Sequence, residues 1–156
     1  MADTVPASEL ASYIGKERPP SDWLTIEQDR INAFADATLD HQFIHLDAEK
    51  AKQTPFGTTI AHGYLTLSLL PYFSAQCGIA PENLVMAINY GSDKVRFLQP
   101  VPVGSRVRCH MVLAEVTEKG PGQLLCKSNV TVEIEGSDKP ALIAEVLSLF
   151  IVGSGS

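Results

Sequence analysis

The chain has 156 residues, 45% of them hydrophobic and 19% charged, which fits one soluble globular domain over residues 1–156. A formal net charge of −6 argues against nucleic acid as a partner bound through the overall field. The sequence shows no signal-peptide pattern and no run of about 18 apolar residues, so we expect a cytoplasmic protein with no membrane partner.

The cysteines do not indicate a disulfide framework or a metal centre. Cys77, Cys109 and Cys126 are far apart, and each falls within an apolar-periodic segment. We therefore expect a reducing compartment, no metal and no separate cofactor.

The first predicted elements are an N-terminal arm or short helix over residues 1–21 and a helix ending near Thr38. The stretch Thr25-Ile26-Glu27-Gln28 matches a capping box, in which Thr25 and Gln28 satisfy each other's backbone donors. Apolar residues then follow helical spacing. Asp40 falls just past the expected end of this helix.

Residues 40–60 form a long polar excursion with one short helical pattern at 47–52, and excursions of this length are often functional. From Ala61 to Cys77 the chain is apolar nearly all round, which predicts a helix buried on most sides. Pro71 should kink this helix or divide it in two.

The rest of the chain alternates with the period of strands. Strands are expected near residues 85–90, 107–113, 130–134 and 142–152, and the last, apolar on both faces, suits a central position. Breakers at Gly104, at Gly120-Pro121-Gly122 and at residues 136–140 predict antiparallel neighbours. The fold class is therefore α+β, with a sheet that wraps the buried helix.

Two polar segments carry the candidate catalytic groups, one from Asp40 to His45 and the other from Thr58 to Tyr64. Asp40 and His45 are five residues apart and could converge on one water molecule if the chain turns back. The alternative is that Asp40 caps a turn and His45 is a surface or hydrogen-bonded core histidine. Gly63, at a helix start, could present its N–H to a carbonyl oxygen that gains charge, or could simply allow tight packing. His62 is interpreted as a packing or hydrogen-bonding residue, so His45 is preferred as the base.

The segment Asn89 to Phe97 places polar groups at an expected strand end and turn. Asn89 and Gly91 are candidate substrate contacts, and Lys94 or Arg96 could meet the phosphates of a nucleotide-bearing ligand such as coenzyme A. A solvated strand edge explains either cation equally well. No Walker, Rossmann or nucleophile-elbow pattern is present.

Together these motifs resemble the MaoC-like, (R)-specific enoyl-CoA hydratase family, and most nearly its NodN-like branch. The resemblance runs from about Thr25 to Phe150 and rests on the following segments: Asp40-x-x-x-x-His45, Pro55-Phe56-Gly57, Ile60-Ala61-His62-Gly63 and Val95 to Gly104. It implies a hot-dog fold, a central helix wrapped by an antiparallel sheet, and a homodimer.

The resemblance also implies an activity and a site. The family's catalytic aspartate falls on Asp40, its histidine on His45, and the glycine that holds the thioester carbonyl on Gly63. The implied reaction, of fatty acid metabolism, is reversible syn hydration of a trans-2-enoyl-CoA to an (R)-3-hydroxyacyl-CoA. Coenzyme A is then part of the substrate. Many members have Asn-Pro where this chain has Gln42-Phe43, which leaves loop rigidity and pocket shape open.

Two other functions stay open at this point. A thioesterase on the same fold would direct water at the thioester carbonyl. A non-catalytic acyl-CoA-binding or NodN-like accessory protein would not turn substrate over at all. The paired Asp40 and His45 favour the hydratase.

Overall fold

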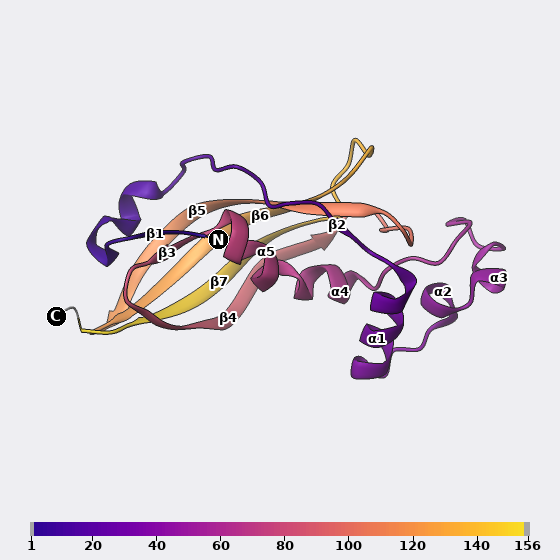
Figure 1. The fold of residues 1–156 in the computed structure, drawn as a ribbon, viewed down its shortest axis with the longest axis horizontal. Coiled ribbons are helices and arrows are strands. Elements are labelled where there is room, and N and C mark those ends of the chain that lie inside the picture. Colours follow the sequence, from indigo (N-terminus) through magenta and orange to yellow (C-terminus); the bar gives the residue numbers. More distant parts are fainter. Residues whose placement is uncertain (1, 155–156) are drawn as a thin grey trace.

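The computed structural model describes residues 2–154, and Figure 1 shows its helices and strands. The helices are the 3-10 helix η1 (Ala7–Tyr13) and α1 (Gln28–Thr38), α2 (Phe43–Leu46), α3 (Ala48–Ala51), α4 (Gly63–Ser68) and α5 (Leu70–Cys77). The strands are β1 (Asp3–Val5), β2 (Leu24–Thr25), β3 (Ile79–Pro81), β4 (Leu84–Phe97), β5 (Arg106–Gly120), β6 (Gln123–Ile134) and β7 (Leu142–Val152).

The main sheet has five strands in the order β2-β5-β6-β7-β4, and every neighbouring pair is antiparallel. The predicted breakers lie between consecutive strands, and Gly122, with φ +70°, turns β5 into β6. Strand β7 runs inside the sheet between β6 and β4, which confirms its predicted central position. The arm contributes η1 and also β1, which pairs in parallel with β3.

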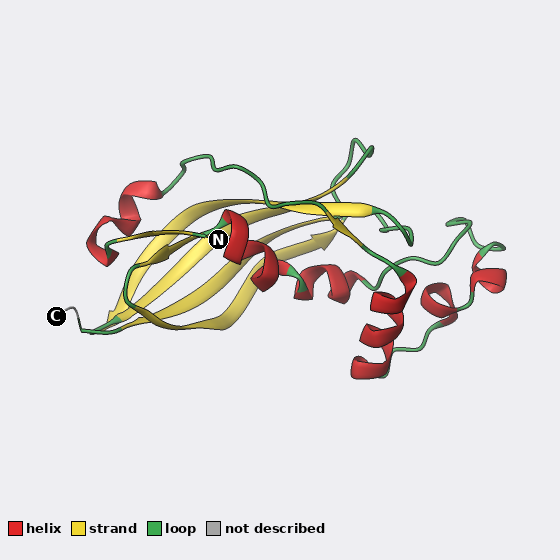
Figure 2. Ribbon diagram, in the orientation of Figure 1, coloured by secondary structure: helices red, strands yellow, loops and turns green. Residues whose placement is uncertain are grey.

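Helix α5 lies across the face around which the sheet curls (Figure 2). Phe73 and Cys77 on its inner face are almost fully buried against β5, β6 and β7. Period-two alternation supplies the opposing surface, since inward residues such as Val107, Cys109 and Val132 are fully buried while their neighbours are not. The predicted α+β fold with a wrapped helix is confirmed.

The central helix is divided, as Pro71 predicts. Helix α4 ends at Ser68, α5 begins at Leu70, and Pro71 is the second residue of α5, where its missing N–H has no helical partner to lose. The prediction of burial on most sides is wrong for one face, because Tyr64 and Tyr72 are 68% and 51% exposed. Apolar content alone did not reveal that this face is open.

Two local predictions are also wrong. Thr25 lies in β2, and α1 begins with Glu27 as its cap and no side-chain capping bond, so there is no capping box. The segment Asn89–Phe97 is not a strand end and turn but the second half of the long strand β4. Register shifts at residues 89–91 and 93–96 interrupt its pairing with β7, and Lys94 adopts φ +51° within the second.

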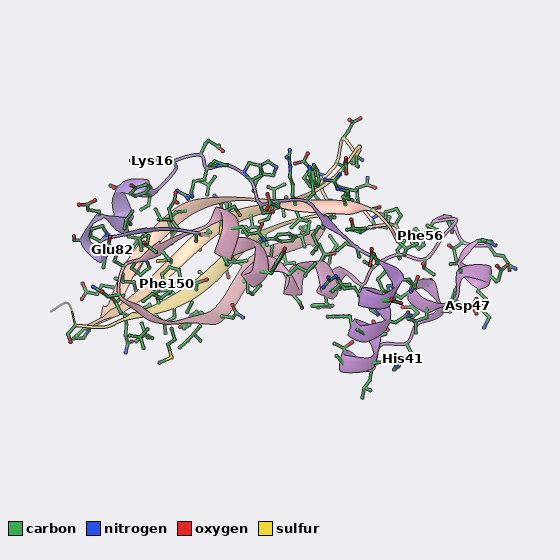
Figure 3. The ribbon with its side chains drawn as sticks, viewed as in Figure 1. Lys16, His41, Asp47, Phe56, Glu82 and Phe150 are labelled. Atoms are coloured by element: carbon green, nitrogen blue, oxygen red, sulfur yellow. The ribbon has the colours of Figure 1, made fainter. Side chains whose placement is uncertain are left out.

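Helices α1, α2 and α3 gather beyond one end of the sheet, and η1 lies at the other (Figure 1). In Figure 3, His41 and Asp47 mark the first end, and Lys16 and Glu82 the second. Cys77, Cys109 and Cys126 are buried and free. Within residues 2–154, no helix has both the length and the apolar character needed to cross a bilayer.

Candidate active site

Asp40 lies where the chain reverses after α1. Leu39 ends that helix in the left-handed conformation, with φ 64°, which sends the chain back towards the helix it has just left. The Asp40 side chain is exposed, and its Oδ1 accepts a bond from the N–H of Gln42 at 3.3 Å. Asp40 therefore does cap a turn, but this long bond occupies only part of its accepting capacity.

His45 lies on α2, a four-residue helix that sequence periodicity did not reveal, rather than in a loop. The side chain is 6% exposed, and its Nδ1 lies 2.7 Å from the carbonyl oxygen of Ile60. Because a carbonyl oxygen only accepts, Nδ1 carries the hydrogen and Nε2 is left as an acceptor. The Gln28 amide donates to the carbonyl of His45 at 2.8 Å and fixes α2 against α1.

Gly63 is positioned by a short backbone ladder. Ala61 donates to Val101 at 2.8 Å and Val103 donates to Thr59 at 2.9 Å, so residues 59–61 run beside residues 101–103. The sequence motifs Ile60-Ala61-His62-Gly63 and Val95 to Gly104 are thus neighbours in space. As the first residue of α4, Gly63 has no helical acceptor for its N–H, and no hydrogen bond among residues 2–154 uses that N–H.

Gly63 also packs closely, as its second interpretation predicts, while the role of its N–H stays a prediction. A Cβ atom at this position would lie 3.0–3.2 Å from three carbon atoms of the Phe97 ring. Ordinary carbon contacts are about 3.5–4.0 Å, so no side chain fits here without movement. The backbone of α4 can therefore approach this ring only because residue 63 is glycine.

Asp40, His45 and His62 converge. One nitrogen from each ring and one carboxylate oxygen all lie within 4.8 Å of one another. The His45 and His62 rings are stacked, with centroids 3.8 Å apart and planes at 24°. His62, at 3% exposure, also has Nε2 at 3.0 Å from the carbonyl oxygen of Asp40, and its Nδ1 is buried without a partner among residues 2–154.

By type, these three residues could hold a metal ion. Nitrogen lone pairs lie in the ring planes, however, and the planes of His45 and His62 are nearly parallel. Two such nitrogens cannot both point at one cation about 2.0–2.1 Å away unless a ring turns. The arrangement suits a water molecule between Asp40 and His45 better.

Burial sets the charge state of His45. Desolvation is the largest effect and lowers its pKa, and the neighbouring His62 lowers it further. The bond to Ile60 and the charge of Asp40 act in the opposite direction but do not cancel the burial. His45 is thus held as a neutral ring with a free acceptor nitrogen near neutral pH.

A pocket of about 260 Å³ opens beside this pair. His45 and Gly63 both line it, so the structure brings them together, whereas Asp40 is exposed and does not line the pocket. The remaining wall is mostly apolar and includes Ile60, Ala61, Thr66, Phe97, Leu98, Gln99, Pro100, Val101 and Ala141. An apolar pocket with a few polar groups is typical of a small-molecule site.

The four candidate residues on β4 do not line this pocket. Asn89, Gly91, Lys94 and Arg96 are all exposed on the strand, although Arg96 adjoins the pocket residue Phe97. The Lys94 ammonium lies 3.3 Å from Glu145, and Arg96 donates to the carbonyl of Val95. Their contact with coenzyme A phosphates stays a prediction.

Among the residues of the site that were not assigned from the sequence, three have a distinct role. Thr66 lines the pocket and is 3% exposed, Phe97 packs on Gly63, and Gln28 joins α1 to His45 and to the Thr59 hydroxyl. Phe97 belongs to a motif that was noticed, but only its packing partner identifies its role. Nothing in local sequence distinguishes Gln28 from a surface helix residue.

Comparison with known proteins places the chain. The family profile described as "MaoC like domain" matches residues 9–135. The 3-hydroxyacyl-thioester dehydratase Z of Mycobacterium tuberculosis is 49% identical, over 92% of this chain and 95% of the relative. Nodulation protein N of Rhizobium leguminosarum bv. viciae is 46% identical, over 91% and 89% respectively.

Solved structures show the same fold. An R-hydratase from Pseudomonas aeruginosa superposes with a TM-score of 0.73 at 22% identity, covering 97% of this chain and 89% of that one. A MaoC-like dehydratase from Rhodospirillum rubrum gives 0.76 at 18% identity, covering 97% and 99%. The fold and the matching family thus define a hot-dog protein of the hydratase and dehydratase class. The chain belongs to the MaoC-like dehydratase family, in its NodN-like branch, and is a hydro-lyase.

Proposed function

We propose that the protein catalyses the reversible syn addition of water to a trans-2-enoyl-CoA, giving an (R)-3-hydroxyacyl-CoA. The observation that carries this proposal is the neutral, buried His45, which has a ring nitrogen within 4.8 Å of an Asp40 carboxylate oxygen and lines the same pocket as Gly63. The names of the R-hydratase and of the 3-hydroxyacyl-thioester dehydratase support it.

In hydration, the Asp40 carboxylate and His45 Nε2 accept the two hydrogens of one water molecule. This orients an oxygen lone pair towards C3 of the enoyl group. The oxygen forms a bond to C3 as one hydrogen passes to the pair, and the pair returns a proton to C2. Because the two groups are close together, they act from one side of the substrate, and water adds to one face.

The electrons of the C2–C3 double bond move onto the thioester carbonyl as C3 is attacked. Its oxygen then carries developing negative charge, which the unused N–H of Gly63 stabilises until C2 is protonated. Dehydration runs the same steps in reverse. The apolar wall of the pocket holds the acyl chain away from water.

The test follows loss of the enoyl-thioester absorbance with crotonyl-CoA and longer trans-2-enoyl-CoAs, and resolves the chirality of the product. Asp40→Asn and His45→Gln should each lower kcat by about 10²–10⁴-fold, the usual contribution of general acid–base catalysis. Asp138→Asn, in the turn before β7, and His110→Gln, on the outer face of β5, are matched controls expected to keep full activity.

Each other outcome has its own meaning. An (R)-3-hydroxy product that persists in both Asp40→Asn and His45→Gln would contradict the mechanism but leave the family activity intact. Release of free thiol would indicate a thioesterase. Absence of turnover at every chain length would favour a non-catalytic accessory protein, an alternative consistent with the similarity to Nodulation protein N.

A homodimer is proposed as the working form. Strand β4 is an edge of the sheet, residues 84–94 are all exposed, and the apolar Val85 and Tyr90 are 62% and 58% exposed. A long apolar edge strand is a surface that proteins normally cover. Sedimentation velocity should show a dimer that Ile88→Lys dissociates and that Ser137→Lys, in an exposed turn, leaves intact. A wild-type monomer at every concentration would contradict this.

A further inference from the structure

We propose that His62 is a positioning residue. Its Nε2–H holds the backbone carbonyl of Asp40, and its ring face holds the ring of His45, so that two catalytic side chains from separate elements keep one relative position. This inference rests on the hydratase function proposed above and assigns a role to a histidine that does not line the pocket.

The link to Asp40 is a hydrogen bond of defined direction. The Asp40 carbonyl oxygen only accepts, so the 3.0 Å contact places the hydrogen on His62 Nε2. His62 is also the residue directly before Gly63 and caps α4. One side chain therefore ties the turn that carries Asp40 to the helix start that carries the Gly63 N–H.

The link to His45 is a ring stack. The two rings lie 3.8 Å apart and nearly parallel, while Phe34 from α1 packs against His62 at 4.9 Å. His45 is held in its plane by the bond to Ile60 and against rotation by the face of His62. Its acceptor nitrogen consequently has a fixed direction before substrate arrives.

The unpartnered nitrogen argues against a purely structural role. With its hydrogen on Nε2, His62 buries Nδ1 without a hydrogen bond from any residue in the range 2–154. Buried polar atoms without partners lower stability, so a residue kept only for packing would be better as phenylalanine. Function accounts for the histidine where stability does not.

Two variants separate the two links. His62→Phe keeps a flat ring against His45 and removes both the donor and the orphan nitrogen. His62→Gln keeps an amide N–H at the same number of bonds from the backbone and removes the ring. If His62 had only a structural role, kcat would fall in each variant only as far as the melting temperature falls.

The measurement is kcat and KM for crotonyl-CoA beside the melting temperature. His62→Phe should melt at or above the wild-type temperature and lose about 10²-fold in kcat, the cost of misplacing a catalytic group by about 1 Å, with KM unchanged. His62→Gln should recover part of that loss despite a lower melting temperature. Wild-type kcat in His62→Phe, or equal kcat in the two variants, would overturn the proposal.

A second measurement does not depend on turnover. In protein labelled with ¹⁵N-histidine, the His62 signals, identified by their loss in His62→Gln, should show a hydrogen on Nε2 and a bare Nδ1. A hydrogen on Nδ1 would overturn the assigned donor even in an active enzyme. The expected tautomer in a protein that turns over no enoyl thioester would instead count against the proposed function alone.

Discussion

Replacing Gly63 by alanine adds one methyl group at the most crowded contact of the site. The new carbon would lie 3.0 Å from Cδ1 of Phe97, against about 3.5–4.0 Å for an ordinary contact. Either the ring or the start of α4 must therefore move by a few tenths of an ångström. Movement of α4 carries the Gly63 N–H away from the thioester oxygen that it is proposed to bind.

The expected loss follows from that displacement. Complete removal of one oxyanion donor costs about 10²–10³-fold in kcat, and a partial displacement should cost about 10–10²-fold. Overpacking should lower the free energy of unfolding by about 1–3 kcal/mol. For a chain of this length each kcal/mol lowers the melting temperature by about 2–4 °C.

The assay is crotonyl-CoA hydration beside thermal unfolding, and the rescue variant is Gly63→Ala with Phe97→Leu. The smaller side chain makes room for the methyl group, so the double variant should regain activity that Gly63→Ala loses. Wild-type kcat in Gly63→Ala would refute the argument that this backbone N–H needs its present position. A double variant that regains stability but not activity would refute displacement as the cause.

Four further outcomes are expected. The pKa of His45 is lowered, mainly by burial and then by His62 against the opposing charge of Asp40, so the acid limb of kcat/KM should have its midpoint below about 6.5. For the same reason the unfolded chain binds more protons than the folded protein, so the free energy of unfolding should decrease as pH falls below about 6.5. The His45→Gln variant should show a weaker pH dependence. A midpoint of the acid limb above about 6.5 would contradict the lowered pKa. Lys94→Ala or Arg96→Ala should raise KM more than it lowers kcat, and should weaken the preference for CoA substrates over dephospho-CoA substrates. Lys119→Ala, at an exposed position, is the control. An unchanged KM would mean that Lys94 and Arg96 only form a solvated strand edge. Prolonged dialysis against a chelator should leave turnover unchanged, and loss restored by one divalent metal would show that the stacked rings rearrange around a cation.

The sequence predicted what local periodicity and breakers control. The bounds of the last strand, the division at Pro71 and the convergence of Asp40 with His45 all follow from short-range patterns. The capping box failed because Gln28 bonds instead to His45 and Thr59, which are distant in sequence. Helix α2 is four residues long and depends on such contacts, so no local pattern marks it.

In the site, too, local patterns predicted some features and contacts between distant residues determine the others. Residue types and spacing indicated Asp40, His45 and Gly63, and the structure places the two that line the pocket together. The stack of His62 on His45 joins residues 17 apart through the ladder beside Val101, and only the fold creates it. The first half of β4 was predicted near residues 85–90, but its continuation to Phe97 was missed, because its bulges break the alternation that marks a strand.

Phe97 has a consequence for anyone who wishes to redesign this protein. Its ring is part of the pocket wall and is also the surface against which Gly63 rests. A smaller side chain at this position would admit bulkier acyl groups but would also loosen the start of α4. A wider substrate range would therefore come with a lower kcat. Leu98, Val101 and Ala141 line the pocket without this second duty at Gly63, and they are the better places to begin.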